Sequence, residues 1–217
     1  MKKNQEPERS PVTLPGHRAG EDPPNKGRTF PAEPLNADEV KKILGAISSR
    51  GHSGIRNRAL VATMWRAGLR VTEALSLYTK DVDLQSGAVS ILHGKGDRRR
   101  TSALDPMGLA VLHRWLDHRT ALGLNGKQTL FCTLRGKPLR ASYVRTMLGR
   151  IARKANVEKR VTPHTFRHSF ACDLMREGKP VNLISAALGH SSVATTSRYL
   201  SHIAPQEVID TLRGRTW

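Results

Sequence analysis

The sequence predicts a mainly helical domain that contains one small antiparallel β-sheet. Apolar residues recur at helical spacing through most of the chain from Asn36 onward, and two short runs of β-forming residues flank a turn with two glycines. The chain has 217 residues, a length that suits one main domain with a sizeable core.

The first 35 residues differ in composition from the rest. They are rich in proline, glycine and charge and show almost no periodic apolar pattern. Such a segment buries too little apolar surface to offset the entropy lost on folding. We therefore expect residues 1–35 to form a flexible tail and residues 36–217 to form the folded domain.

Three helices are expected at the start of this domain. Asn36 is suited to cap a helix whose apolar residues at 40, 43, 44 and 47 share one side, and a break follows at residues 50–54. A second helix is predicted over residues 55–67, where Gly68 ends it. A short third helix over residues 71–77 follows directly.

The predicted sheet is a hairpin. Residues 88–92 and 100–104 are β-type runs on either side of the segment 93–97, whose Gly94 and Gly96 suit a tight turn. From Pro106 onward the pattern is helical again. Helices are predicted over residues 107–122, 141–155, 163–177, 181–188, 193–200 and 205–212.

The chain is strongly basic. It has 36 Lys and Arg against 18 Asp and Glu, a formal net charge of +18. Residues 1–36 hold six basic and five acidic side chains, so nearly all of the excess belongs to the folded part. A basic folded surface indicates a polyanionic partner, and it does not by itself choose among DNA, RNA and an anionic membrane.

Several classes of protein are excluded by composition. No apolar run approaches the roughly 18 to 20 residues that span a bilayer, and the first 35 residues lack the apolar centre of a signal peptide. An intracellular protein without a membrane partner is therefore expected. Cys132 and Cys172 both lie in apolar settings, which favours buried thiols over a disulfide and argues against a cysteine-based zinc site.

Arg70 and Glu73 form the first candidate functional pair. They are three residues apart just after a glycine break, so on a helix their side chains share a face and Glu73 can hold the guanidinium of Arg70. An ordinary surface ion pair is the alternative for this segment.

His164 and Arg167 form the second pair. Pro163 favours a helix start, and side chains at i and i+3 project together. A guanidinium can hold two phosphate oxygens, while an imidazole can transfer a proton near neutral pH. Metal binding by His164 and His168 at i, i+4 is an alternative, although no third ligand is evident.

Tyr199 lies nine residues after His190, which follows the glycine turn at Gly189. A helix, a glycine turn and a second helix also fit a DNA-reading helix-turn-helix, and Tyr199 could equally be a half-buried aromatic residue. Lys95 lies in the predicted hairpin turn before three arginines, a pattern that is a solvated charge run in most proteins.

Taken in order, Arg70, Lys95, His164, Arg167, the string LGH at 188–190, and Tyr199 resemble the signature of the tyrosine recombinases, the phage-integrase and Xer-type family. The strings AGLRVTEALSL, PHTFRHSFA and LGHSSVATTSRYL carry the resemblance, which runs from about Asn36 to Ile203. It implies the tyrosine recombinase catalytic-domain fold and a site-specific DNA recombinase that integrates, excises, inverts or resolves DNA.

The resemblance also implies roles for individual residues. Tyr199 attacks a DNA phosphate and leaves a 3′-phosphotyrosyl enzyme, while Arg70 and Arg167 hold the non-bridging oxygens and Glu73 braces Arg70. Lys95 protonates the departing 5′-oxygen. His164 assists proton transfer to and from the tyrosine, and His190 forms a hydrogen bond to the phosphate. Further DNA contacts come from Arg98, Arg99, Arg100 and Arg198.

The phosphotyrosine ester stores the energy of the cut bond, so the resemblance implies no ATP, metal or other cofactor. It implies double-stranded DNA as the partner, a tetrameric synapse, possible accessory DNA-binding proteins, and a cytoplasmic place on nucleoid, plasmid or phage DNA.

The segment before Asn36 is too short and polar for the family's core-binding domain. Residues 205–212 resemble the helix that docks onto a neighbouring subunit, with packing on its own core as the alternative.

Two other functions remain open at this point. A type IB topoisomerase-like enzyme would share the active site but relax DNA without recombinant products. A DNA-binding regulator would retain the fold without catalysis.

Overall fold

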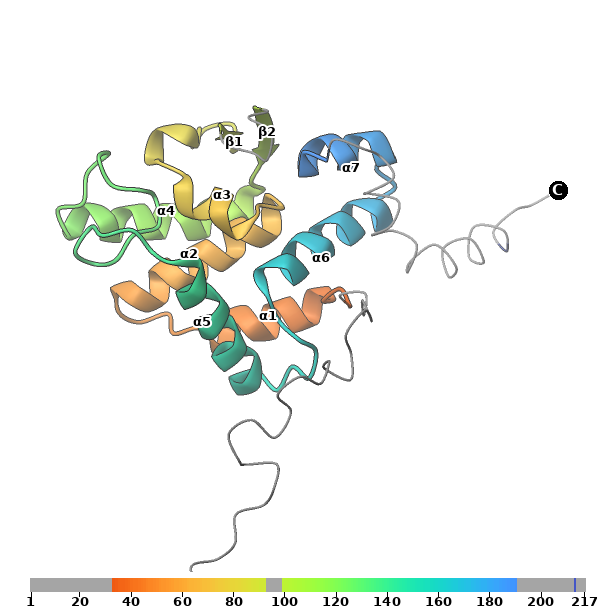
Figure 1. The fold of residues 1–217 in the computed structure, drawn as a ribbon, viewed down its shortest axis with the longest axis horizontal. Helices are drawn as coiled ribbons and strands as arrows, with labels where there is room; N and C mark the ends of the chain where they lie inside the picture. Colours follow the sequence, from red (N-terminus) through yellow and green to blue (C-terminus); the bar gives the residue numbers. More distant parts are fainter. Residues whose placement is uncertain (1–32, 93–98, 191–212, 214–217) are drawn as a thin grey trace, which may run out of the picture. The chain divides into compact units, whose positions relative to one another are not determined.

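The computed structural model describes residues 33–92, 99–190 and 213. Its described part is mainly helical with one two-stranded antiparallel sheet, which confirms the predicted fold class (Figure 1). The elements are α1 (Ala37–Ala46), α2 (His52–Arg66), α3 (Val71–Ser76), η2 (Thr79–Asp81), β1 (Ala88–Ile91), β2 (Arg100–Ala103), α4 (Pro106–Ala121), α5 (Ala141–Lys154), α6 (Pro163–Arg176) and α7 (Val181–Leu188). The expected tail up to residue 32, the turn at 93–97 and the helices at 193–200 and 205–212 lie outside the described residues.

Helix α2 runs through the middle of the domain and contacts α1, α3, α4 and α6 (Figure 1). Its residues from Ala59 to Trp65 are all buried. A helix that is covered on every side needs apolar or small side chains all round, which α2 has in this stretch. It therefore serves as the core element from which the ends of α3 and α6 are positioned.

The starts of two helices follow the predicted capping chemistry. Asn36 accepts a hydrogen bond from the backbone of Glu39, and Glu39 accepts one from Asn36 N, both at 2.8 Å. Thr162 caps α6, with Pro163 in its first position. These caps satisfy N–H groups that a helix start leaves unpaired.

The predicted break at 50–54 is partly wrong, because α2 already begins at His52. Gly51 has φ +72° and allows the turn there. Gly54 lies inside the helix, where a Cβ would overlap the carbonyl oxygen of Ser48. This glycine therefore permits close packing and does not interrupt the helix.

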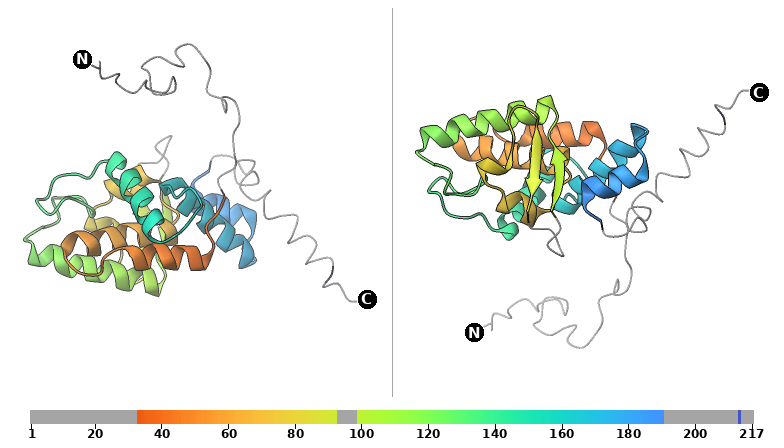
Figure 2. Two further views of the ribbon diagram at one scale, coloured as in Figure 1. Left: turned by 90° about the horizontal axis from the view of Figure 1, so that it is seen from below. Right: turned by 90° about the horizontal axis from the view of Figure 1, so that it is seen from above.

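The two strands lie side by side (Figure 2), with Ala88 opposite Ala103 and Ile91 opposite Arg100. Val89 and Ile91 face the core. On β2, the buried hydroxyl of Ser102 donates a hydrogen bond of 2.8 Å to the carbonyl oxygen of Ala67. This bond fixes the sheet to the end of α2, next to the glycine turn that precedes Arg70.

The connection between α4 and α5 is held by two buried side chains of α4. Trp115 Nε1 donates to the carbonyl oxygen of Leu130 at 2.8 Å. Arg119, which is 2% exposed, donates to the carbonyl oxygens of Asn125 and Thr129 at 2.7 and 2.8 Å. These bonds supply partners for backbone carbonyls that no helix or strand pairs.

Cys132 and Cys172 are buried and do not form a disulfide with each other, as predicted. No helix within the described ranges combines the length and the apolar character needed to cross a membrane.

Candidate active site

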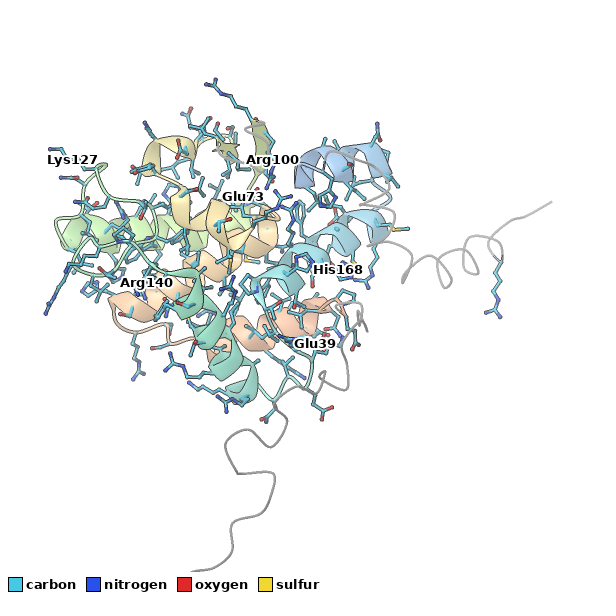
Figure 3. The ribbon with its side chains drawn as sticks, viewed as in Figure 1. Glu39, Glu73, Arg100, Lys127, Arg140 and His168 are labelled. Atoms are coloured by element: carbon cyan, nitrogen blue, oxygen red, sulfur yellow. The ribbon has the colours of Figure 1, made fainter. Side chains whose placement is uncertain are left out.

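Four segments of the chain meet beside Glu73. They are the start of α3 with Arg70, the first residue of β2 with Arg100, helix α6 with Arg167, and the end of α7. Figure 3 shows Glu73 and Arg100 next to each other where α3, β2 and α7 approach one another.

Arg70 is placed by the turn that ends α2. Gly68 has φ +59°, and a Cβ at this position would overlap the ring of Phe170. After this turn Arg70 is extended, and its backbone N–H donates to Glu73 Oε2 at 2.7 Å. Its Nη1 also donates to Glu73 Oε1 at 2.7 Å. The side chain of Glu73 is only 1% exposed, so the alternative of an ordinary surface ion pair is wrong.

Glu73 is shared by three arginines. Besides Arg70, Arg100 Nη2 lies 2.7 Å from Oε2, and Arg167 Nη1 lies 3.7 Å from the same oxygen. Burial raises the pKa of this carboxyl group, but the hydrogen bonds from Arg70 and the charges of Arg100 and Arg167 outweigh burial and lower the pKa overall. Glu73 is therefore ionised at neutral pH, and three guanidinium groups against one carboxylate leave an excess of two positive charges.

Arg167 is held mainly by backbone carbonyls. Its side chain is 3% exposed. Nη1 donates to the carbonyl oxygen of Gly68 at 2.7 Å, and Nη2 donates to that of Leu188. The carbonyl of Leu188 lies at the C-terminal end of α7, where partial negative charge favours a cation, and that of Gly68 lies in the turn after α2. Arg70 has a more open side chain, 34% exposed, and so can reach an incoming anion directly.

Two histidines border this positive cluster. His164 lies in the first turn of α6, and His190 follows Gly189, whose left-handed conformation (φ +63°) ends α7. Loss of hydration and then the charges of Arg167 and Arg70 lower the pKa of both rings, that of His190 to about 4. Both imidazoles are therefore neutral at pH 7 and able to accept a proton when an anion enters.

The structure thus brings Arg70, Glu73, His164, Arg167 and His190 to one place, as the charge interactions among them show. Tyr199, Lys95, Arg98 and Arg198 lie outside the described residues. Arg99 is exposed just before β2.

Arg100 differs from the expectation of a DNA contact. Its guanidinium points inward to Glu73 and offsets the charge of this buried carboxylate, which would otherwise be uncompensated. Arg100 was not predicted to lie in the cluster, because a run of three arginines does not show which of them turns inward. The observed pairing of Ile91 with Arg100 across the hairpin identifies it.

Metal binding by His164 and His168 was the alternative for this segment. Within the described residues, no group of three His, Cys, Asp or Glu side chains could hold a metal ion, so no third ligand is found there. His164 is exposed whereas His168 is 2% exposed, so the two rings do not open to a common surface.

A family model described as the phage integrase family matches residues 33–206. The chain belongs to the phage integrase family. This finding confirms the resemblance seen in the motifs, and the match includes every residue of the cluster.

Curated relatives of this phage integrase family member include the tyrosine recombinase XerD of Staphylococcus aureus, 31% identical over 189 residues, which are 86% of this chain and 63% of that protein. The tyrosine recombinase XerD of Ralstonia nicotianae is 34% identical over 179 residues, 80% of this chain and 57% of that protein. The chain spans about three fifths of the length of these relatives.

Solved structures of other recombinases have the same fold. The crystal structure of XerA recombinase superposes with a TM-score of 0.76 at 33% identity and covers 88% of this chain and 69% of that one. The XerH site-specific recombinase, in a post-cleavage complex with a palindromic difH substrate, gives a TM-score of 0.70 at 32% identity and covers 84% and 53%.

Proposed function

We propose that this protein is a site-specific DNA recombinase, which cuts and rejoins double-stranded DNA through a covalent bond to Tyr199. The observation that carries the proposal is the cluster of Arg70, Arg100 and Arg167 around the buried carboxylate of Glu73, with neutral histidines at its border. Such a cluster has the charge and the donors to hold a phosphodiester.

The cluster suits the transition state of phosphoryl transfer. Negative charge builds on the non-bridging oxygens as the attacking oxygen approaches phosphorus, and fixed guanidinium donors offset this charge without reorganising. Arg70 and Arg167 supply these donors, and Glu73 holds Arg70 in one orientation through two hydrogen bonds. Planar guanidinium groups match pairs of phosphate oxygens.

Tyr199 is the nucleophile in this proposal. Its phenolic oxygen forms a bond to phosphorus as the bond from phosphorus to the 5′-oxygen breaks, and Lys95 gives that oxygen its proton. A phenol has an ordinary pKa of about 10, so it needs a proton acceptor and nearby positive charge. His164 is neutral and takes the proton, and His190 holds the phosphate by a hydrogen bond. Rejoining is the same reaction in reverse.

Double-stranded DNA is the proposed partner, with four protomers in the synapse and accessory DNA-binding proteins where the site requires them. The net charge of +18 supports a DNA partner. The DNA-bound XerH structure supports the same choice.

Covalent trapping tests the proposal. Purified protein is mixed with a nicked suicide duplex that carries a candidate site, and the product is separated on a denaturing gel. A protein–DNA band that is absent for Tyr199→Phe, while this variant still binds the duplex, is the expected result. Binding without a band, even with partner proteins present, would favour the DNA-binding regulator. Relaxation of plasmid DNA without recombinant products would favour the topoisomerase-like enzyme.

A further inference from the structure

Arg100 connects two parts of the cluster that the chain supplies separately. Its Nη2 donates to Glu73 Oε2 at 2.7 Å, and its Nη1 donates to the carbonyl oxygen of Ala187. One guanidinium therefore joins α3, which carries Arg70, to the last turn of α7, which leads to His190. Both acceptors carry negative charge, a full charge on Glu73 and a partial charge at the helix end.

The side chain of Arg100 is closely confined. It is 8% exposed, and a Cβ on Gly189 would overlap its Cδ. Its Nε–H is buried without a hydrogen-bond partner among the described residues. A buried donor that stays unsatisfied destabilises the fold, so this placement is not explained by stability alone.

We propose that Arg100 is a positioning residue, which fixes Glu73 and the end of α7 so that Arg70 and Arg167 keep the geometry that holds the phosphate. The proposal rests on the proposed function. Arg100 and Arg167 compete for Oε2 of Glu73, at 2.7 and 3.7 Å. With Arg100 present, Arg167 stays on the carbonyl oxygens of Gly68 and Leu188. Without Arg100, the carboxylate attracts Arg167 and draws it away from an incoming phosphate.

The test is single-turnover cleavage of a suicide duplex at saturating protein, with Arg100→Met compared to wild type. Arg140→Met is the control, because Arg140 is exposed at the start of α5 and lies away from Glu73 and Arg100 (Figure 3). A misplacement of reacting groups by about 1 Å can slow a reaction about 100-fold. We therefore expect cleavage to be slowed about 10- to 100-fold in Arg100→Met. We expect wild-type cleavage within about 3-fold for Arg140→Met, the usual range for a single exposed charge, with similar DNA affinities for both variants.

A second substrate identifies the step that is affected. A sulfur in place of the bridging 5′-oxygen leaves as a thiolate, and a thiol with a pKa of about 8.5 needs no proton donor to depart. We expect the Arg100→Met defect to persist with this substrate, since the phosphate-binding arginines are still misplaced. Restored cleavage would overturn the proposal, because Arg100 would then serve the leaving group. Wild-type rates for Arg100→Met on the ordinary duplex would also overturn it.

Arg100→Lys keeps the proposal testable if Arg100→Met does not fold. A single ammonium group can pair with Glu73 but cannot donate to Ala187 in the same geometry. Slowed cleavage on both substrates is expected, and wild-type rates would contradict the proposal. Failure of the proposed function is distinguishable, because wild-type protein would then form no covalent product with either substrate.

Discussion

Replacing Glu73 by Gln removes the one negative charge inside the arginine cluster. The four contacts of the carboxylate divide between its oxygens, with Oε1 accepting from Arg70 Nη1 and Oε2 facing Arg70 N, Arg100 and Arg167. Glutamine has a single side-chain oxygen, so its NH₂ group must replace one of the two carboxylate oxygens. On that side it faces N–H donors of the arginines and cannot accept their hydrogen bonds. The guanidinium groups of Arg100 and Arg167 also stay buried without a counter-charge.

Removing one partner of a buried ion pair typically costs about 3–5 kcal/mol. We expect Glu73→Gln to lower the free energy of unfolding by about this amount, which for a domain of this size lowers Tm by roughly 6–20 °C. The pKa of Glu73 is lowered by folding, so its contribution is present above the unfolded value of 4.5 and is lost as the pH falls below it. In Glu73→Gln the free energy of unfolding should therefore fall less steeply as the pH is lowered below 4.5.

Urea unfolding and calorimetry at pH 7 and pH 4 measure both effects. Asp38→Asn is the control, because Asp38 pairs with Lys41 at 3.2 Å but is 81% exposed. An exposed pair contributes about 0–1 kcal/mol, so little change is expected in the control. If Glu73→Gln lowers the free energy of unfolding by less than about 1 kcal/mol, no more than expected for an exposed pair, then Glu73 does not stabilise the fold as a buried counter-charge.

The histidines and glycines of the site give two further predictions. The pKa of His190 is about 4 in the fold against 6.5 ordinarily, so His190 weakens folding as the pH falls between these values. A bound phosphate should raise the pKa of His190, so the protein should take up protons when it binds DNA. Calorimetry in buffers of different ionisation enthalpy should show this uptake, and His190→Asn should reduce it. A binding enthalpy that is the same in every buffer would contradict this prediction. Gly68→Ala should destabilise the fold more than Gly123→Ala, since both have positive φ but only Gly68 lies against Phe170. Equal losses in thermal unfolding would show that the ring moves aside.

Local chemistry was enough to predict most helices. Asn36 and Pro163 mark the starts of α1 and α6, because caps act within one turn of the chain. Gly54 was misinterpreted as part of a break, since its close approach to Ser48 is a tertiary contact that no local pattern contains. The 3₁₀ turn η2 was also not predicted, although its bond from Tyr78 N to Asp81 Oδ2 is local.

The site was predicted in part. The spacing of Arg70 and Glu73 on a helix indicated their pairing, but the burial of Glu73 depends on β2 and α6, which come later in the chain. The inward turn of Arg100 was not predictable from a run of three arginines. It depends on the carbonyl oxygen of Ala187 and on the missing Cβ of Gly189.

The bonds that Arg119 donates have a consequence for local opening of the chain. Residues 122–140 contain no helix or strand, and a connection of this kind ordinarily exchanges its amide hydrogens quickly with solvent. Here the carbonyl oxygens of Asn125, Thr129 and Leu130 all accept from one buried guanidinium, so removal of Arg119 would take a partner from all three at once. The amide of Leu130, which is buried and donates to the carbonyl oxygen of Leu77 at 2.6 Å, should exchange as slowly as the amides of the core helices, and Arg119→Met should speed its exchange.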